Sequence, residues 1–230
     1  SVEMKNKNIL VFAAHPDDEV LGCSGTVAKL ISQGNKVKAV FFTNGVSSRG
    51  TGISKKNVLE RQVAAILVAK KLKCYKPTFY NFPDNELDTI PLLKIIKTIE
   101  KEIKKFNPSI IFTHFDKDLN IDHKIISTAV TTATRPISKK SNLEKILFFE
   151  VLSSTEWANF TKENLFSPNY FVNIEKHIEI KKELLKLYKK ELKEWPHPRS
   201  TKGIEILSNY RGMACGKKNA EAFLVSKIFK

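Results

Sequence analysis

The sequence predicts an α/β fold: a Rossmann-like, mostly parallel sheet with helices on both faces. Short, continuous apolar runs alternate with longer segments of helical periodicity up to about residue 150. A polar loop follows most of the apolar runs, as at the carboxyl ends of parallel strands. With 230 residues, 42% of them hydrophobic and 27% charged, the chain is large enough to bury a core. These observations together predict βαβ units with right-handed crossovers.

The apolar runs predict buried strands over residues 8–14, 36–43, 77–82, 109–113 and 145–151. Helical periodicity predicts helices over residues 19–33, 54–73, 88–106, 121–134, 175–194 and 200–215. Glycine and proline separate the elements, since both interrupt regular structure. The last part of the chain also predicts two short strands, over residues 170–174 and, at a sheet edge, over residues 222–226.

The pattern contains neither an internal repeat nor a clear linker, so one domain is predicted over residues 4–230. Residues 1–3, which precede Met4, are interpreted as an added remnant. Two polar stretches, 44–53 and 153–169, are predicted to be loops that cover the substrate. No segment approaches the length of a membrane span.

The net charge of +15 comes mostly from lysines spread over the predicted helices. Such a charge suits nucleic acid, an anionic membrane or a phosphorylated substrate, but it also arises when lysines decorate solvated helix faces. No basic run is interleaved with aromatic residues, as single-strand binding requires. No nucleic-acid partner is therefore expected, and an RNA-associated protein is the weakest of the alternatives.

The three cysteines, Cys23, Cys74 and Cys215, are far apart and form no CxxC pair. Neither a disulfide framework nor a cysteine zinc site is indicated. The amino terminus lacks the length of apolar run and the cleavage site of a signal peptide. A reducing, cytoplasmic location is expected.

One histidine and three carboxylates crowd into residues 15–19 of the segment AHPDDE, directly after the first predicted strand. Crowded carboxylates repel one another unless a cation offsets their charge. A second cluster, THFDKDLNIDH over residues 113–123, follows the fourth predicted strand. Both clusters fall at the same edge of a parallel sheet, and two histidines with one carboxylate form the usual ligand set of catalytic zinc. The sequence therefore predicts a divalent metal site.

The AHPDDE segment, the Thr43–Gly45 strand end and the Asp122–His123 pair resemble the PIG-L/LmbE-like zinc-dependent N-acetylglucosaminyl deacetylases. The resemblance extends from about Asn8 to Val225 and includes the carboxyl-terminal AEAF at residues 220–223. It implies a Rossmann-like fold and removal of an acetyl group from an N-acetylated amino sugar or its conjugate by a metal-activated water.

By this resemblance His15, Asp18 and His123 are the metal ligands, and Asp17 is the general base. The cofactor is then Zn²⁺, although Fe²⁺ or cobalt suits the same ligands. Arg61 lies where members of the family often carry a substrate-contacting arginine, but it is equally explained as a salt-bridged helix residue.

Glu19 is expected outside the ligand set or at a helix start, where its charge suits the helix dipole. Asp122 is expected to support its loop or a neighbouring imidazole by a hydrogen bond. His114 is either a partner of a ligand or an ordinary residue at a strand end. Asp84, at the third strand end, either touches the substrate or stabilises a turn.

One position departs from the family's pattern. Many members carry a histidine three residues before the last metal histidine, and here that residue is Asn120. Asparagine can donate a hydrogen bond to an oxyanion but cannot act as an acid. His197 is the candidate replacement, with a structural loop histidine as the alternative, and Arg199 is a candidate substrate-binding residue. Asp17 itself is the other candidate to protonate the leaving amine.

The sequence thus predicts a metal-dependent N-deacetylase of an amino-sugar substrate, with homo-oligomerisation left open. The first alternative is hydrolysis of another acyl amide or ester on the same fold. The second is a nucleotide-binding or regulatory module with a degenerate site. Gly22 and Gly25 do not form a GxGxxG fingerprint, so nucleotide binding has weak support.

Overall fold

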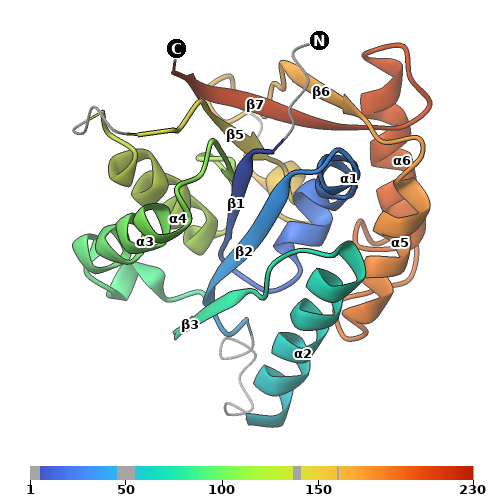
Figure 1. Ribbon diagram of the computed structural model, residues 1–230. Helices are drawn as coiled ribbons and strands as arrows, with labels where there is room; N and C mark the ends of the chain where they lie inside the picture. Colours follow the sequence, from blue (N-terminus) through green and yellow to red (C-terminus); the bar gives the residue numbers. More distant parts are fainter. Residues whose placement is uncertain (1–5, 46–54, 137–140, 160, 230) are drawn as a thin grey trace.

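The computed structural model describes residues 6–45, 55–136, 141–159 and 161–229. These residues form a seven-stranded sheet in the order β3-β2-β1-β4-β5-β7-β6 (Figure 1). The parallel strands are β1 (Asn8–Ala13), β2 (Lys36–Thr43), β3 (Thr78–Phe82), β4 (Ile110–His114) and β5 (Lys145–Phe149). The two remaining strands, β6 (Tyr170–Asn173) and β7 (Ala220–Ile228), pair antiparallel with each other, and β7 also pairs antiparallel with β5.

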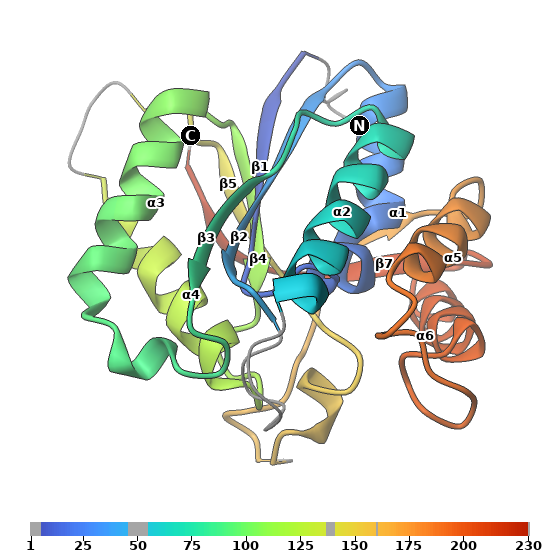
Figure 2. The ribbon, with the colours of Figure 1, turned by 90° about the horizontal axis from the view of Figure 1, so that it is seen from below.

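Helices cover both faces of the sheet. The described helices are α1 (Asp18–Ser32), α2 (Lys55–Leu72), α3 (Leu92–Phe106), α4 (Ile121–Ala133), α5 (Ile178–Leu187) and α6 (Thr201–Met213). In Figure 2, α3 and α4 lie on one side of the parallel strands, and α1 and α2 lie on the other. None of the described helices is both long and apolar enough to cross a membrane.

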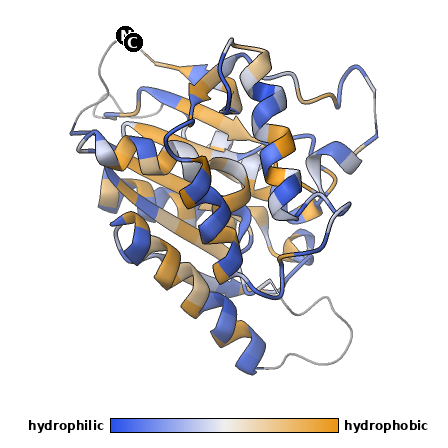
Figure 3. Cartoon of the chain, turned by 90° about the vertical axis from the view of Figure 1, so that its right-hand side faces the viewer, coloured by the Kyte–Doolittle hydropathy of each residue, from blue (hydrophilic) through white to orange (hydrophobic). Residues whose placement is uncertain are grey.

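The central strands are buried on both faces because successive side chains enter two different cores. In β1, Ile9 and Val11 belong to the core beneath α1 and α2, whereas Leu10 and Phe12 belong to the core beneath α3 and α4. Figure 3 shows the corresponding pattern: the strands are largely hydrophobic, whereas each helix is hydrophilic on part of its surface. The predicted α/β fold class is confirmed.

Two predictions for the carboxyl-terminal part are wrong. The strand predicted at a sheet edge is β7, which lies inside the sheet between β5 and β6. The helix predicted over residues 175–194 is α5, which ends at Leu187. Past that point the chain turns, with the N–H of Glu191 donating to the carbonyl of Tyr188 at 2.9 Å. Lysine-rich periodicity continues through this turn, so pattern alone could not locate the end of the helix.

The boundaries of the other elements agree with the expected ranges to within a few residues, with one exception. The segment predicted as a single helix over 88–106 is a 3₁₀ turn (Leu87–Thr89) followed by α3. The predicted loop at 44–53 lies mostly outside the described residues, as do residues 1–3.

The sheet order reverses at β1, which lies between β2 and β4. The connections after β1 and β4 therefore diverge from neighbouring strand ends, and in open α/β sheets such a point forms the ligand crevice. The His/Asp cluster at residues 15–19 follows β1, and the cluster at residues 113–123 lies at the end of β4. Glycine at position 22 permits the close approach of α1 to the sheet, because a Cβ there would lie 2.4 Å from Cδ2 of Phe149.

Candidate metal centre and active site

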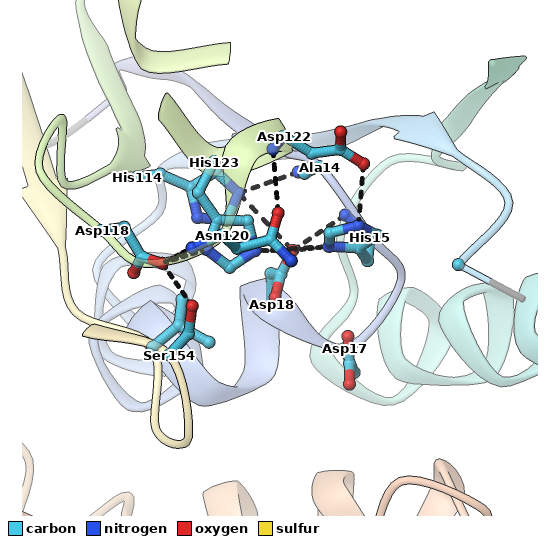
Figure 4. A network of polar contacts seen from close by, with 12 residues as sticks. Ala14, His15, Asp17, Asp18, His114, Asp118, Asn120, Asp122, His123 and Ser154 are labelled. Atoms are coloured by element: carbon cyan, nitrogen blue, oxygen red, sulfur yellow. Dashed lines mark hydrogen bonds and ion pairs between the residues drawn. The ribbon is translucent and has the colours of Figure 1, made fainter. Parts of the chain in front are cut away.

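Three potential ligand atoms meet at the end of β1 (Figure 4). Nδ1 of His15 lies 3.1 Å from Oδ2 of Asp18, and Nε2 of His123 lies 3.3 Å from that same oxygen. The two ring nitrogens are themselves 3.3 Å apart. His15 follows β1, Asp18 begins α1, and His123 lies in the first turn of α4, so three separate elements position the group.

The donor set fits a divalent ion. All three side chains are buried, and Oδ1 of Asp18 has no hydrogen-bond partner among the described residues. Burial raises the pKa of Asp18, but the charges of His123 and His15 outweigh it and hold that pKa well below its ordinary value. The carboxylate is therefore ionised, as a metal ligand must be. Two imidazole nitrogens and one carboxylate match catalytic zinc sites.

The other ring nitrogen of His15 faces two further carboxylates. Its Nε2 lies 3.0 Å from Oδ1 of Asp84 and 3.2 Å from Oδ2 of Asp122. These groups also lie close enough to form a second potential metal group. However, Asp122 accepts backbone N–H bonds from Asn85 at 2.7 Å and from Leu87 at 3.0 Å. The arrangement thus suits orientation of the His15 ring, which is how metal-ligating histidines are usually held.

Asp118, which is not among the predicted site residues, contacts the ring of His123 much as Asp84 and Asp122 contact that of His15. Its Oδ1 lies 3.1 Å from Nδ1 of His123, while Oδ2 accepts from the hydroxyl of Thr155 at 2.6 Å. Ser154 donates to the same carboxylate. Burial opposes ionisation, but His123 and these hydroxyls lower the pKa of Asp118 to about 2. Its position five residues before His123 in the second cluster was the available sequence clue.

His114 packs against the potential metal ligands without joining them. Its ring stacks on that of His123 with centroids 3.8 Å apart, and its Nε2 accepts the backbone N–H of Ala14 at 2.8 Å. Burial, together with the charge of His123, lowers the pKa of His114 well below its ordinary value. It is therefore a neutral imidazole that ties the end of β4 to the end of β1.

Asp17 lies beside the three potential ligands, in contact with two arginines. Oδ1 is 3.1 Å from Nη2 of Arg61, and Oδ2 is 3.0 Å from Nη1 of Arg199. Burial raises the pKa of Asp17, against the opposing effect of the two guanidiniums. The backbone of Asp17 has a φ of 127°, an unusual value for a residue other than glycine. Such strain costs about 1–3 kcal/mol and is typical of functional sites.

Glu19 occupies the first turn of α1, at the helix start where it was expected. Its side chain is buried, accepts from the hydroxyl of Tyr188, and accepts from the backbone N–H of Asp17 at 2.9 Å. Burial raises the pKa of Glu19 to about 8. The carboxyl is thus mostly protonated at neutral pH, so it acts as a hydrogen-bonding group more than as a charge.

A polar cavity of about 140 Å³ opens next to these groups. Its lining residues are His15, Asp17, Gly45, Arg61, Asp84, Asn85, Asn120 and Arg199. The side chain of Asn120 caps α4 by accepting from the N–H of Asp122 at 2.9 Å, and its Nδ2 donates to Asn85 at 2.8 Å. All three predicted substrate-binding residues, Arg61, Asp84 and Arg199, line this cavity.

His197 is not among the residues that line the cavity. Its ring lies against Trp157, with centroids 5.6 Å apart, and its Nδ1 accepts the backbone N–H of Arg199 at 3.1 Å. Burial, with the charges of Arg199 and Lys193, lowers the pKa of His197. In this geometry it fixes the backbone that carries Arg199.

The model of the PIG-L family, described as GlcNAc-PI de-N-acetylase, matches residues 10–134, which is more than half of the chain. This chain belongs to the PIG-L family. The family predicted from the AHPDDE segment and the Asp122–His123 pair is confirmed.

Two curated relatives carry deacetylase names. The "Uncharacterized deacetylase YaiS" of Escherichia coli (strain K12) is 30% identical over 191 residues, covering 80% of this chain and 92% of that protein. The "Probable N-acetyl-alpha-D-glucosaminyl L-malate deacetylase 2" of Bacillus cereus is 29% identical over 143 residues, covering 58% of this chain and 64% of that protein.

Solved structures share the fold at lower identity. The N,N'-diacetylchitobiose deacetylase from Pyrococcus horikoshii superposes with a TM-score of 0.75 at 21% identity, covering 95% of this chain and 83% of that one. GalB from Pseudomonas putida KT2440, a 4-carboxy-2-hydroxymuconate hydratase, gives a TM-score of 0.72 at 16% identity, covering 97% and 98%. A hydratase therefore shares the architecture, so the fold alone does not determine the reaction.

Proposed function

We propose that the protein is a metal-dependent N-deacetylase that hydrolyses the acetamide of an N-acetylated amino sugar or of its conjugate. The observation that carries this proposal is the convergence of ligand atoms from His15, Asp18 and His123 beside the buried carboxylate of Asp17. Family membership and the deacetylase names of the two curated relatives support it.

His15, Asp18 and His123 would hold the metal ion. When bound, zinc would supply a water of lowered pKa and polarise the acetamide carbonyl. We propose zinc because of the two-histidine, one-carboxylate donor set, although Fe²⁺ accepts the same ligands. Elemental analysis of the purified protein tests this point. A protein that holds no stoichiometric metal and regains no activity with added Zn²⁺ or Fe²⁺ would contradict it and would favour a regulatory module.

Asp17 would accept the proton of the attacking water, since it is a buried carboxylate that lines the cavity beside the three proposed ligands without being one of them. Arg61 and Arg199, one on each oxygen, would fix its orientation. The same carboxyl would then carry the proton to the leaving amine, because His15 is the one histidine among the described residues that line the cavity. The amide nitrogen of Asn120 carries two hydrogens and donates one of them to Asn85, so the second N–H would be the donor to the developing oxyanion.

The lining of the cavity supports a hydroxyl-rich substrate. Apart from Gly45, every described residue that lines the cavity carries a polar side chain. Asp84, Asn85 and Asn120 offer donors and acceptors of the kind that bind sugar hydroxyls. We therefore propose that these groups bind the sugar ring. The cytoplasmic location expected from the cysteine pattern stays a prediction.

Replacing Asp17 by Asn tests the central assignment. Loss of a general base costs about 10²–10⁴-fold in turnover. We expect a loss of that size in acetate released from N-acetylglucosamine or N,N'-diacetylchitobiose, with metal content unchanged. Undiminished turnover would remove Asp17 from the mechanism.

Two further assays separate the alternatives. If acetate is not released from either acetamido sugar but is released from an aryl acetate ester or a simple acetamide, the protein cleaves another acyl group on the same fold. Replacing His197 by Ala tests its predicted acid role: a large fall in kcat would support that role, whereas a rise in KM alone would fit placement of Arg199.

A further inference from the structure

Four buried or half-buried side chains, those of Asp17, Arg61, Glu191 and Arg199, form a closed ring of alternating charge. Glu191 completes the ring: its Oε1 lies 3.7 Å from Nη1 of Arg61, and its Oε2 lies 3.5 Å from Nη1 of Arg199. The two arginines in turn contact the two oxygens of Asp17. Glu191 is only 2% exposed, so the ring is largely shielded from water.

The ring joins two distant parts of the chain. Asp17 and Arg61 lie within the family match at residues 10–134, whereas Glu191 and Arg199 come from the turn that follows α5. That turn folds back on itself, since Lys193 donates its N–H to the carbonyl of Arg199 at 3.2 Å. The folded turn therefore brings Glu191 and Arg199 to Asp17 together.

The two arginines differ in how firmly they are held without Glu191. Arg61 also donates to the carbonyl of Pro16 at 3.2 Å and to that of Gly45. Apart from the ring, the guanidinium of Arg199 has one protein acceptor among the described residues, the carbonyl of Leu152 at 3.3 Å. Removing the charge of Glu191 would leave two neighbouring guanidiniums facing one carboxylate, and the less anchored of them would move.

We propose that Glu191 is a positioning residue for the hydrolysis: it holds Arg199 against Asp17, so that the carboxylate keeps one guanidinium on each oxygen. This inference rests on the proposed function, in which Asp17 handles the proton. By this proposal the turn after α5, which lies outside the family match, supplies two of the four side chains of the ring, Glu191 and Arg199. Misplacement of a reacting group by about 1 Å can cost on the order of 100-fold in rate.

The test compares Glu191→Gln, which removes the charge at constant size, with Glu191→Asp, which keeps the charge on a shorter side chain. We expect Glu191→Gln to lower kcat about 10-fold to 100-fold, with KM changed less than kcat and metal content unchanged. Glu191→Asp should recover part of the loss. Glu194→Gln is the matched control, because Glu194 is an exposed carboxylate of the same turn, and it should leave kcat unchanged.

A double-mutant cycle with Arg199→Ala shows whether Glu191 acts through Arg199. If it does, Glu191→Gln should add little to the loss caused by Arg199→Ala. Fully additive losses, or a wild-type kcat for Glu191→Gln, would overturn the proposal.

A crystal structure of Glu191→Gln supplies a readout that does not need activity. We expect the guanidinium of Arg199 to leave hydrogen-bond distance of Asp17, and an unmoved Arg199 would overturn the proposal. If the wild-type protein releases no acetate, the proposed function fails. In that case the position of the Arg199 guanidinium in the Glu191→Gln crystal structure still shows whether Glu191 holds Arg199 against Asp17.

Discussion

Replacing Asp118 by Asn should weaken metal binding without removing any ligand. Asp118 lies 3.1 Å from Nδ1 of His123, the nitrogen opposite the one that faces His15 and Asp18. A carboxylate in this position fixes the imidazole's tautomer and raises its basicity toward the metal. The charges of Asp18 and Asp118 outweigh burial and raise the pKa of His123 to about 9. The neutral amide would remove that support while keeping the shape of the side chain.

Loss of such a partner typically lowers metal affinity 10-fold to 100-fold, which is about 1.4–2.7 kcal/mol of binding free energy. The affinity is measured by competition with a chelator of known zinc affinity. Asp118 also accepts from Ser154, Thr155 and the N–H of Asn120, so the free energy of unfolding should fall by about 1–3 kcal/mol.

Asp116→Asn is the matched control, because it makes the same chemical change two residues earlier in the same loop, at a half-buried position. We expect its zinc affinity to match that of the wild-type protein. Unchanged affinity in Asp118→Asn, or an equal loss in both variants, would refute the argument that His123 depends on Asp118.

Two other predictions concern stability. The pKa of Glu19 is about 8 in the folded protein against an ordinary 4.5, so stability is lost as pH rises from about 4.5 to about 8, by at most about 5 kcal/mol at 1.36 kcal/mol per unit. Glu19→Gln, which mimics the protonated form, should flatten the dependence of the urea midpoint on pH in that window, and an unaltered slope would contradict the raised pKa. Gly22→Ala places a Cβ 2.4 Å from the Phe149 ring and should destabilise the fold by about 1–3 kcal/mol in urea unfolding, whereas an unchanged midpoint would mean that the ring can shift freely.

The parallel part of the sheet could be predicted from sequence because its cause is local. Strands such as β1 are buried on both faces, so they appear as continuous apolar runs, and helices appear as periodic ones. The candidate metal centre could be predicted for a similar reason, since His15, Asp18 and His123 belong to two short clusters that each follow a strand. Parallel strands bring their carboxyl ends to one edge, which converts two distant clusters into one site.

The carboxyl-terminal third was less predictable. Its lysine-rich periodicity runs past Leu187, and nothing local to the sequence indicates that the chain turns back there. The position of β7 inside the sheet depends on which neighbours pair with it, and strand pairing is a long-range property.

The sequence alone determined which residues could bind a metal. Histidine and carboxylate side chains are metal-binding groups, and their position directly after apolar runs can be seen in the sequence. Only the tertiary structure decided which other side chains contact and orient those residues. Asp118 was present in the second cluster, but its contact with His123 depends on how the loop folds. The contacts of Arg199 and Glu191 with the surroundings of Asp17 join residues more than 100 positions apart. Such contacts depend on packing between elements, and no local pattern encodes them.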